Sequence, residues 1–180
     1  KRMGLVLSGG GAKGAYQAGV FQAMEEAGLC PRVEAISGCS IGAMNALLFA
    51  TGDPALWRQA WEESDFGAMG GGGVTPARME MLALQATQAG GLERYLQGEW
   101  LLPLDPLRQL ARQVAGPEKL ALGRPRISVC AYQLEAEEPR YFWLDGRPLD
   151  QVVELAAASS ALPVAFPPVE FQGKHYCDGG

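Results

Sequence analysis

Strand-like and helical patterns alternate along the first 50 residues of the chain. Residues 4–8 form a short apolar run, residues 32–37 form a second strand-like segment, and glycines follow each. After the first glycine group, apolar side chains recur at helical spacing until Gly28, a residue type that commonly ends helices. After the second group, residues 41–50 are apolar on nearly all sides, which predicts a buried helix. Strand, glycine turn and helix, repeated in this order, are typical of a parallel α/β sheet.

The rest of the chain predicts further helices and then further strands. Three pairs of an N-cap residue and a proline each predict the start of a helix: Asp53-Pro54, Thr75-Pro76 and Asp105-Pro106. These helices are expected near 54–64, 76–89 and 106–115, with a flexible glycine-rich segment at 67–73. Beyond residue 116 the expected elements are strands at 126–132 and 140–144, a helix at 149–159, and a hairpin of 169–171 and 175–177.

These elements predict a three-layer α/β/α fold with a mostly parallel central sheet and a functional site at the carboxyl ends of the strands. With 48% hydrophobic and 19% charged residues, the 180-residue chain can form one packed domain, which we expect to span residues 1–180. Its net charge of −5 argues against nucleic-acid binding, because phosphate recognition needs a basic surface.

The cysteines and the apolar segments bear on cofactors and location. The four cysteines include no C-x-x-C pair and the chain has one histidine, so a Cys/His zinc site has little support. We expect free thiols and no cofactor. The sequence has no signal-peptide pattern and no apolar stretch of membrane-spanning length, so we expect a cytoplasmic protein, although a segment before Lys1 could carry a signal.

The segment Gly38-Cys39-Ser40-Ile41-Gly42 matches the nucleophile elbow G-x-S-x-G. A serine at a sharp strand-to-helix turn is exposed above the helix N-terminus, where free N–H groups favour a developing negative charge. Glycines two positions away, Gly38 and Gly42, let neighbouring chains pass closely. The alternative is an ordinary turn in which Ser40 only caps the helix, and the pentapeptide alone leaves both interpretations open.

A second glycine group, residues 9–14, lies between the first predicted strand and helix. Consecutive glycines can direct several backbone N–H groups toward one anion, either an oxyanion or a phosphate. Gly9, Gly11 and Gly14 also satisfy G-x-G-x-x-G, the dinucleotide fingerprint, with Glu34 twenty residues further on. Glu34 is predicted in the middle of its strand rather than at its end, which weakens the dinucleotide interpretation.

The third candidate is Asp178, followed by two glycines that let another loop approach it. An Asp-Gly pair is more often an ordinary turn. The one histidine, His175, is three residues before Asp178 on the same predicted strand, so the two side chains point to opposite faces and a Ser-His-Asp triad is strained. If Ser40 is activated, direct action of a carboxylate is the simpler arrangement, and burial would have to raise the pKa of Asp178.

Together, the glycine loop with Lys13, the G-x-S-x-G turn and the late Asp-Gly-Gly resemble the patatin-like phospholipase family. The flanking segments at 40–46 and 158–168 are similar to that family as well, so the resemblance covers almost the whole chain. It implies a Ser40–Asp178 catalytic dyad and an oxyanion hole from the N–H groups of the glycine loop and the residue after the nucleophile. The oxyanion-hole residues are then Gly9, Gly10, Gly11 and Ile41, and Lys13 is expected to be structural. Chains of this family continue past the Asp-Gly-Gly segment, so we expect the domain to be truncated at its C-terminus.

The resemblance implies a lipid acyl hydrolase of the phospholipase A or esterase type, acting on acyl esters of lipids. A transient membrane or micelle contact through residues 100–102 would fit this substrate. Two alternatives remain: a dinucleotide-binding protein that uses residues 9–14, and a non-catalytic interaction module with the same fold.

Overall fold

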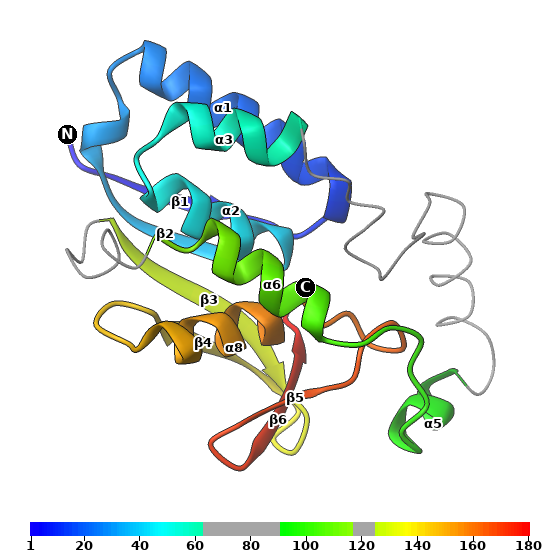
Figure 1. Cartoon of the computed structure of the whole chain (residues 1–180). Helices are drawn as coiled ribbons and strands as arrows, with labels where there is room; N and C mark the ends of the chain where they lie inside the picture. Colours follow the sequence, from blue (N-terminus) through cyan, green and yellow to red (C-terminus); the bar gives the residue numbers. More distant parts are fainter. Residues whose placement is uncertain (63–90, 117–124) are drawn as a thin grey trace.

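The computed structural model describes residues 1–62, 91–116 and 125–180 (Figure 1). A six-stranded sheet lies at its centre, with the strand order β1-β2-β3-β6-β5 and with β4 paired to β3. The strands are β1 (Met3–Leu7), β2 (Val33–Cys39), β3 (Arg126–Gln133), β4 (Glu138–Trp143), β5 (Val169–Phe171) and β6 (Lys174–Asp178).

The direction of the strands confirms the mostly parallel sheet. β1, β2 and β3 are parallel neighbours. β4 and β6 are antiparallel to β3, and β5 is antiparallel to β6, so β5 runs in the direction of β3. Four of the six strands (β1, β2, β3 and β5) therefore share one direction.

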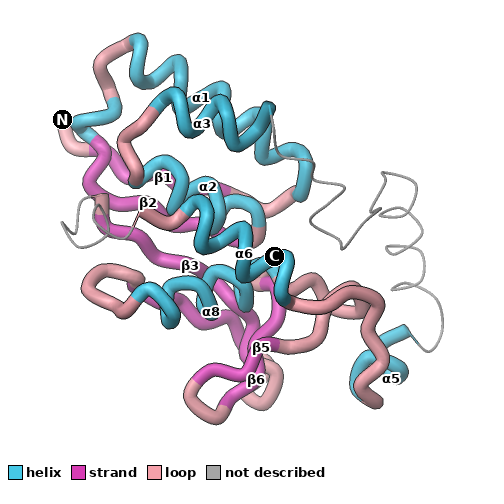
Figure 2. Tube along the Cα trace, in the orientation of Figure 1, coloured by secondary structure: helices cyan, strands magenta, loops and turns pink. Residues whose placement is uncertain are grey.

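Helices pack on one face of this sheet (Figure 2). These helices are α1 (Gly14–Glu26), α2 (Ile41–Ala50), α3 (Pro54–Glu62), α6 (Asp105–Val114) and α8 (Leu149–Ser160). The short helix α5 (Gly91–Leu96) lies away from the sheet (Figure 1), and short 3-10 turns lie at Gly11–Lys13 and Cys30–Arg32. α2 and α8 contact the strands directly. α1 and α3 pack on α2, and α6 packs on both α2 and α8. No helix in the described ranges is both long and apolar enough to cross a membrane.

The core is centred on α2, in which every residue is buried. The ring of Phe49 stacks on Trp57 of α3 with 5.2 Å between centroids, and Phe21 of α1 meets Phe49 edge-on at 4.7 Å. Offset and edge-on aromatic pairs of this kind add to the free energy gained by burying their area. The helix predicted to be apolar on all sides therefore joins the outer helices to the sheet.

The opposite face of the sheet carries exposed side chains. Val6, Ser37, Ser128 and Trp143 are register partners across β1, β2, β3 and β4, so their side chains share one face. Val6 is 86% exposed and Trp143 46% exposed, and the guanidinium of Arg126 lies 4.2 Å from the centroid of the Trp143 ring. The described residues thus supply one helical layer, and the second layer of the expected α/β/α arrangement is not among them.

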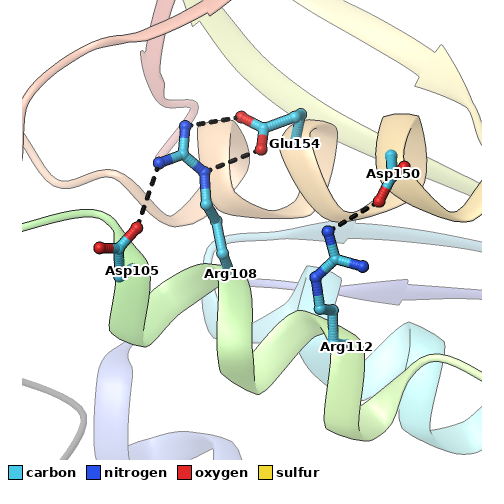
Figure 3. A network of polar contacts seen from close by, with 5 residues as sticks. All are labelled: Asp105, Arg108, Arg112, Asp150 and Glu154. Carbon is cyan, nitrogen blue, oxygen red and sulfur yellow. Dashed lines mark hydrogen bonds and ion pairs between the residues drawn. The ribbon is translucent and has the colours of Figure 1, made fainter.

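Ion pairs fasten α6 to α8 (Figure 3). The guanidinium of Arg108 binds the carboxylate of Glu154 through two hydrogen bonds of 2.8 and 2.9 Å, and it also pairs with Asp105 at 3.5 Å. Further along the same helices, Arg112 pairs with Asp150 at 2.7 Å. The two-point contact fixes the position of α8 relative to α6 more strongly than a single-point ion pair can.

The expected elements correspond closely to the observed ones, with two differences. The helix predicted from Asp105-Pro106 starts at Asp105 itself with Leu104 as its N-cap, so the prediction of Asp105 as the cap was wrong. Its carboxylate binds Arg108 instead of backbone N–H groups. The short helix α5 was not predicted. The segments expected at 67–73 and 76–89 lie outside the described residues.

Candidate active site

Ser40 lies at the sharp turn between β2 and α2, with φ 56° and ψ −128°. A non-glycine residue with such a backbone costs about 1–3 kcal/mol and persists only where its surroundings enforce it. A Cβ added to Gly38 would lie closer than 3.0 Å to the backbone of Gly42, and one added to Gly42 would lie closer than 3.0 Å to the carbonyl of Leu7. Both positions therefore require glycine, as the elbow motif predicts.

The glycine loop lies against this turn. A Cβ added to Gly9 would be 3.1 Å from Ser40 Cβ. Gly10 and Gly11 follow with φ of 140° and 55°, which glycine adopts readily. Ile41 is the first residue of α2, so its N–H has no acceptor within the helix. The loop and the helix N-terminus thus bring the expected oxyanion-hole residues to the vicinity of Ser40.

Asn45 holds this loop in place from the middle of α2. Its side chain is 2% exposed, and its Nδ2 donates to the carbonyl of Gly14 at 3.0 Å and to Gln17 Oε1 at 2.8 Å. Gln17 in turn donates to the carbonyl of Ser8 at 2.8 Å, at the start of the loop. We assigned no role to Asn45 from the sequence, although a lone amide in an otherwise apolar helix signals a buried hydrogen-bond network.

Asp178 reaches Ser40 because β2 and β6 end at adjacent positions beside β3. Cys39, the last residue of β2, pairs with Cys130, and Asp178, the last residue of β6, pairs with Ala131. β4 occupies the other edge of β3 at these positions, so β2 and β6 lie along the same edge and their carboxyl ends meet. This end-to-end meeting places the two residues together.

The carboxyl group of Asp178 is buried, with the residue 7% exposed. Burial is the main cause that raises the pKa of Asp178 above its ordinary value. Hydrogen bonds from the Ser40 hydroxyl, from the N–H of Gly180 (2.9 Å) and from the Cys39 thiol (3.9 Å) oppose this rise in pKa. A Cβ added to Gly179 would lie 2.7 Å from the carbonyl of Cys130, so the first glycine after Asp178 is sterically required.

The end of α8 contacts Ser40 and the strand of Asp178. The N–H of Ser40 donates to the carbonyl of Ser159 at 3.0 Å and to its hydroxyl at 3.1 Å, and the Ser160 hydroxyl donates to the carbonyl of Ser40 at 3.1 Å. The N–H of Asp178 donates to the carbonyl of Ala161 at 2.9 Å. The sequence places these positions in the family-like segment 158–168 but gives them no individual role.

The other sequence candidates lie away from this site. His175 is exposed, and its Nδ1 lies 2.8 Å from Glu135 Oε1, as expected for a hairpin residue. Glu34 forms an ion pair with Arg2 at 3.0 Å in the first half of β2, so it is not at the strand end that a ribose-binding carboxylate occupies. Lys13 is exposed, and its stem packs along Gly10. In the described part of the chain, no group of three or more His, Cys, Asp or Glu side chains could hold a metal ion.

Known proteins share both the sequence and the fold. The lysophospholipase nte1 of Aspergillus terreus is 52% identical over 50 residues, which are 28% of this chain and 3% of that protein. The lysophospholipase NTE1 of Cryptococcus neoformans var. neoformans is 48% identical over the same length and share. This chain therefore matches only a small fraction of the length of these curated relatives.

Two bacterial structures share the fold. VipD from Legionella pneumophila aligns with a TM-score of 0.64 at 22% identity, over 99% of this chain and 46% of VipD. ExoU of Pseudomonas aeruginosa, in its heterodimeric complex with SpcU, aligns with a TM-score of 0.50 at 22% identity, over 90% of this chain and 36% of ExoU. The family model of the patatin-like phospholipases matches residues 5–180, a continuous span that includes the glycine loop, the elbow and Asp178. The chain belongs to the patatin-like phospholipase family.

Proposed function

We propose that the chain is a lipid acyl hydrolase of the phospholipase A or esterase type, with Ser40 as nucleophile and Asp178 as general base. The observation that carries this proposal is the contact between a strained, elbow-mounted serine hydroxyl and a buried carboxylate. A carboxylate with a raised pKa is a stronger base than a solvated one, and it needs no histidine to act on a hydroxyl. The family and the lysophospholipase relatives support the lipid substrate class.

The reaction then has two acyl-transfer steps. Asp178 accepts the proton of Ser40 Oγ while Oγ forms a bond to the ester carbonyl carbon. The carbonyl oxygen becomes an oxyanion, stabilised by the N–H groups of the glycine loop (Gly9, Gly10 and Gly11) and of Ile41. The tetrahedral intermediate expels the alcohol, which takes the proton from Asp178. Asp178 next takes a proton from a water molecule whose oxygen attacks the acyl-enzyme carbonyl carbon. As the second tetrahedral intermediate collapses, Asp178 returns this proton to Ser40 Oγ and the fatty acid is released.

A lipid surface can be contacted beside this site. Trp100 and Leu101 are 45% and 44% exposed, and Leu162 is 40% exposed. Leu102, which the sequence included in this contact, is 6% exposed and packs with Ala165, so that part of the prediction was wrong. The N–H of Leu101 donates to the carbonyl of Ala165 at 3.2 Å, so the segment with Trp100 and Leu101 is joined to the loop that follows α8. The same loop begins at Ala161, whose carbonyl accepts the hydrogen bond of the Asp178 N–H. Tryptophan and leucine side chains at a protein surface favour the boundary between lipid headgroups and acyl chains.

The two alternatives are distinguished by chemistry. A dinucleotide-binding protein would need an acidic residue at the end of β2, where Cys39 stands, and Glu34 is engaged with Arg2. A non-catalytic module would keep the elbow geometry but would have no reactive hydroxyl.

Labelling with a fluorophosphonate probe tests the proposal, since the probe reacts with activated serines. We expect the chain to be labelled and the Ser40→Ala variant to be silent. The matched control is Ser37→Ala, which removes another serine of β2 and should leave labelling unchanged. Absence of labelling in the unmodified chain would favour the non-catalytic module.

A further inference from the structure

Ser159 has a buried hydroxyl that the dyad chemistry does not use. Ser159 is the second-last residue of α8 and is 0% exposed. A fully buried hydroxyl is retained in a core only where it finds hydrogen-bond partners, and Ser159 finds them in Cys130 and Ser40, with the Cys39 thiol as a further contact. Cys130 belongs to β3, and Ser40 is the turn residue between β2 and α2.

The hydroxyl of Ser159 connects the nucleophile to the central strand. It donates to the carbonyl of Cys130 in β3 at 2.6 Å. It accepts from the backbone N–H of Ser40 at 3.1 Å, and this N–H is also 3.0 Å from the carbonyl of Ser159. A hydroxyl has one donor and two acceptor positions, so both contacts can exist together. The elbow peptide is thereby held at a fixed orientation relative to β3.

This orientation matters because Ser40 has a φ of 56°, a conformation that relaxes unless the surroundings hold it. If the peptide between Cys39 and Ser40 rotated, Ser40 Oγ would move away from Asp178. The N–H of Ile41, one peptide further on, would also change direction.

Ser159 and the two residues that follow it also contact Asp178. The N–H of Asp178 donates to the carbonyl of Ala161 at 2.9 Å, and the hydroxyl of Ser160 donates to the carbonyl of Ser40 at 3.1 Å. The segment 159–161 therefore binds both the N–H and the carbonyl of Ser40, and it also binds the N–H of Asp178. The ion pair of Arg108 with Glu154 fixes the helix that carries this segment (Figure 3).

We propose that Ser159 is a positioning residue that holds the nucleophile Ser40 in its reactive conformation, by linking the Ser40 N–H to the carbonyl of Cys130 in β3. The inference rests on the proposed hydrolase function for its kinetic consequence, but the structural link itself is independent of catalysis. Ser159 touches neither the substrate nor the reacting atoms.

The kinetic test compares Ser159→Ala with the unmodified chain on a soluble short-chain p-nitrophenyl ester. We expect kcat to fall roughly ten- to a hundredfold with little change in KM, since misplacing a reacting group has effects of this size. The acid limb of the pH–rate profile should not move, because Ser159 does not contact the Asp178 carboxylate. Ser159→Cys, which keeps a weak donor and acceptor, should be intermediate. The matched control is Ser128→Ala, which removes a buried serine hydroxyl of β3 and should retain the original kcat.

A second measurement separates this inference from the proposed function. We expect amide hydrogen exchange at Ser40, followed by NMR, to be at least several times faster in Ser159→Ala and unchanged in Ser128→Ala. Unchanged exchange at Ser40, or an unchanged kcat in an active enzyme, would overturn the positioning role. If the unmodified chain shows no esterase activity, the proposed function fails, and the exchange rate alone decides the inference.

Discussion

At the scale of single residues, the site depends on close approach. Ser40 is strained, the glycines around it permit backbone contacts that a Cβ would block, and Asp178 is buried. The strain at Ser40 and the buried carboxyl group of Asp178 each lower the free energy of unfolding, since both oppose folding. The surrounding hydrogen bonds to Asn45, Ser159 and Ser160 offset them.

Replacing Gly42 with alanine should destabilise the chain. The new Cβ would lie closer than 3.0 Å to the carbonyls of Leu7 and Ser8, which belong to the backbone and cannot move aside cheaply. Overpacking of this kind costs about 1–3 kcal/mol, measured as the free energy of unfolding in urea. Gly19→Ala is the control, because a Cβ there meets nothing within 4 Å in the middle of α1. It should stabilise the helix by about 0.5–1 kcal/mol, and equal losses in both variants would contradict the steric explanation.

Replacing Asp178 with asparagine should abolish hydrolysis but raise Tm at neutral pH. Burial raises the pKa of Asp178 in the folded state, so folding favours its protonated form. The stability that this preference provides is fully present below the unfolded pKa of about 3.9, and it is lost as the pH rises through the folded value. Asparagine carries no charge, so its Tm advantage should be present at pH 7 and vanish near pH 3 in thermal unfolding scans. An advantage that persists at pH 3 would point to a cause other than ionisation.

At the scale of elements, α8 is a support rather than a source of catalytic groups. Its middle is fastened to α6 by Arg108 and Glu154, and its C-terminal end contacts the elbow. The side chains of this ion pair are 35% and 29% exposed, whereas those of Arg112 and Asp150 are 52% and 81% exposed. The less exposed pair is screened less by solvent and should contribute more to stability.

Arg108→Met and Arg112→Met test this difference. We expect Arg108→Met to lower the free energy of unfolding by about 1 kcal/mol, because Glu154 loses a two-point partner in a half-buried position. Arg112→Met should change it by less than about 0.5 kcal/mol. Denaturation in urea at low and high salt measures both, and a larger loss in Arg112→Met would show that the exposed pair is the stronger one.

The strand–glycine–helix units could be predicted from sequence because they are local. The helix predicted at 41–50 is observed with those bounds, and the expected hairpin of β5 and β6 is present. The meeting of β2 and β6 beside β3 could not be predicted, because it depends on pairing between segments far apart in the chain. The contacts of Ser159 also arise only when α8 is placed on the sheet. Asp105 was misassigned because an Asp-Pro pair fits both the N-cap and the first helical position, and a tertiary partner, Arg108, decides between them.

At the scale of the whole molecule, the exposed apolar side chains of the described residues include two groups on separate surfaces, besides Tyr16 and Val20 of α1. Trp100, Leu101 and Leu162 lie on loops connected to the active site, whereas Trp143 lies on the open face of the sheet. The two tryptophans are exposed to nearly the same extent, at 45% and 46%. Because their positions differ, comparing a variant of each tryptophan distinguishes lipid contact through the loops from a general effect of surface hydrophobicity.

Trp100→Ser should reduce hydrolysis of phosphatidylcholine vesicles several-fold, because it removes an exposed side chain suited to the lipid interface. Hydrolysis of a soluble short-chain ester should be unchanged. Trp143→Ser should leave both rates unchanged, and vesicle sedimentation measures binding separately from turnover. Equal losses in both variants would mean that the loop surface has no special part in lipid contact.

The end-to-end meeting of β2 and β6 also has a consequence for folding. Ser40 and Asp178 are 138 positions apart, since the contact of Cys39 with Asp178 spans 139 positions. Contacts between such distant segments form late, after the loop between them has closed. A chain in which only the first three strands have assembled would have its elbow but no base beside it. Reactivity of Ser40 during refolding should therefore appear together with the β3–β6 pairing. The time at which a reagent for active serines begins to label Ser40 then measures when this pairing forms.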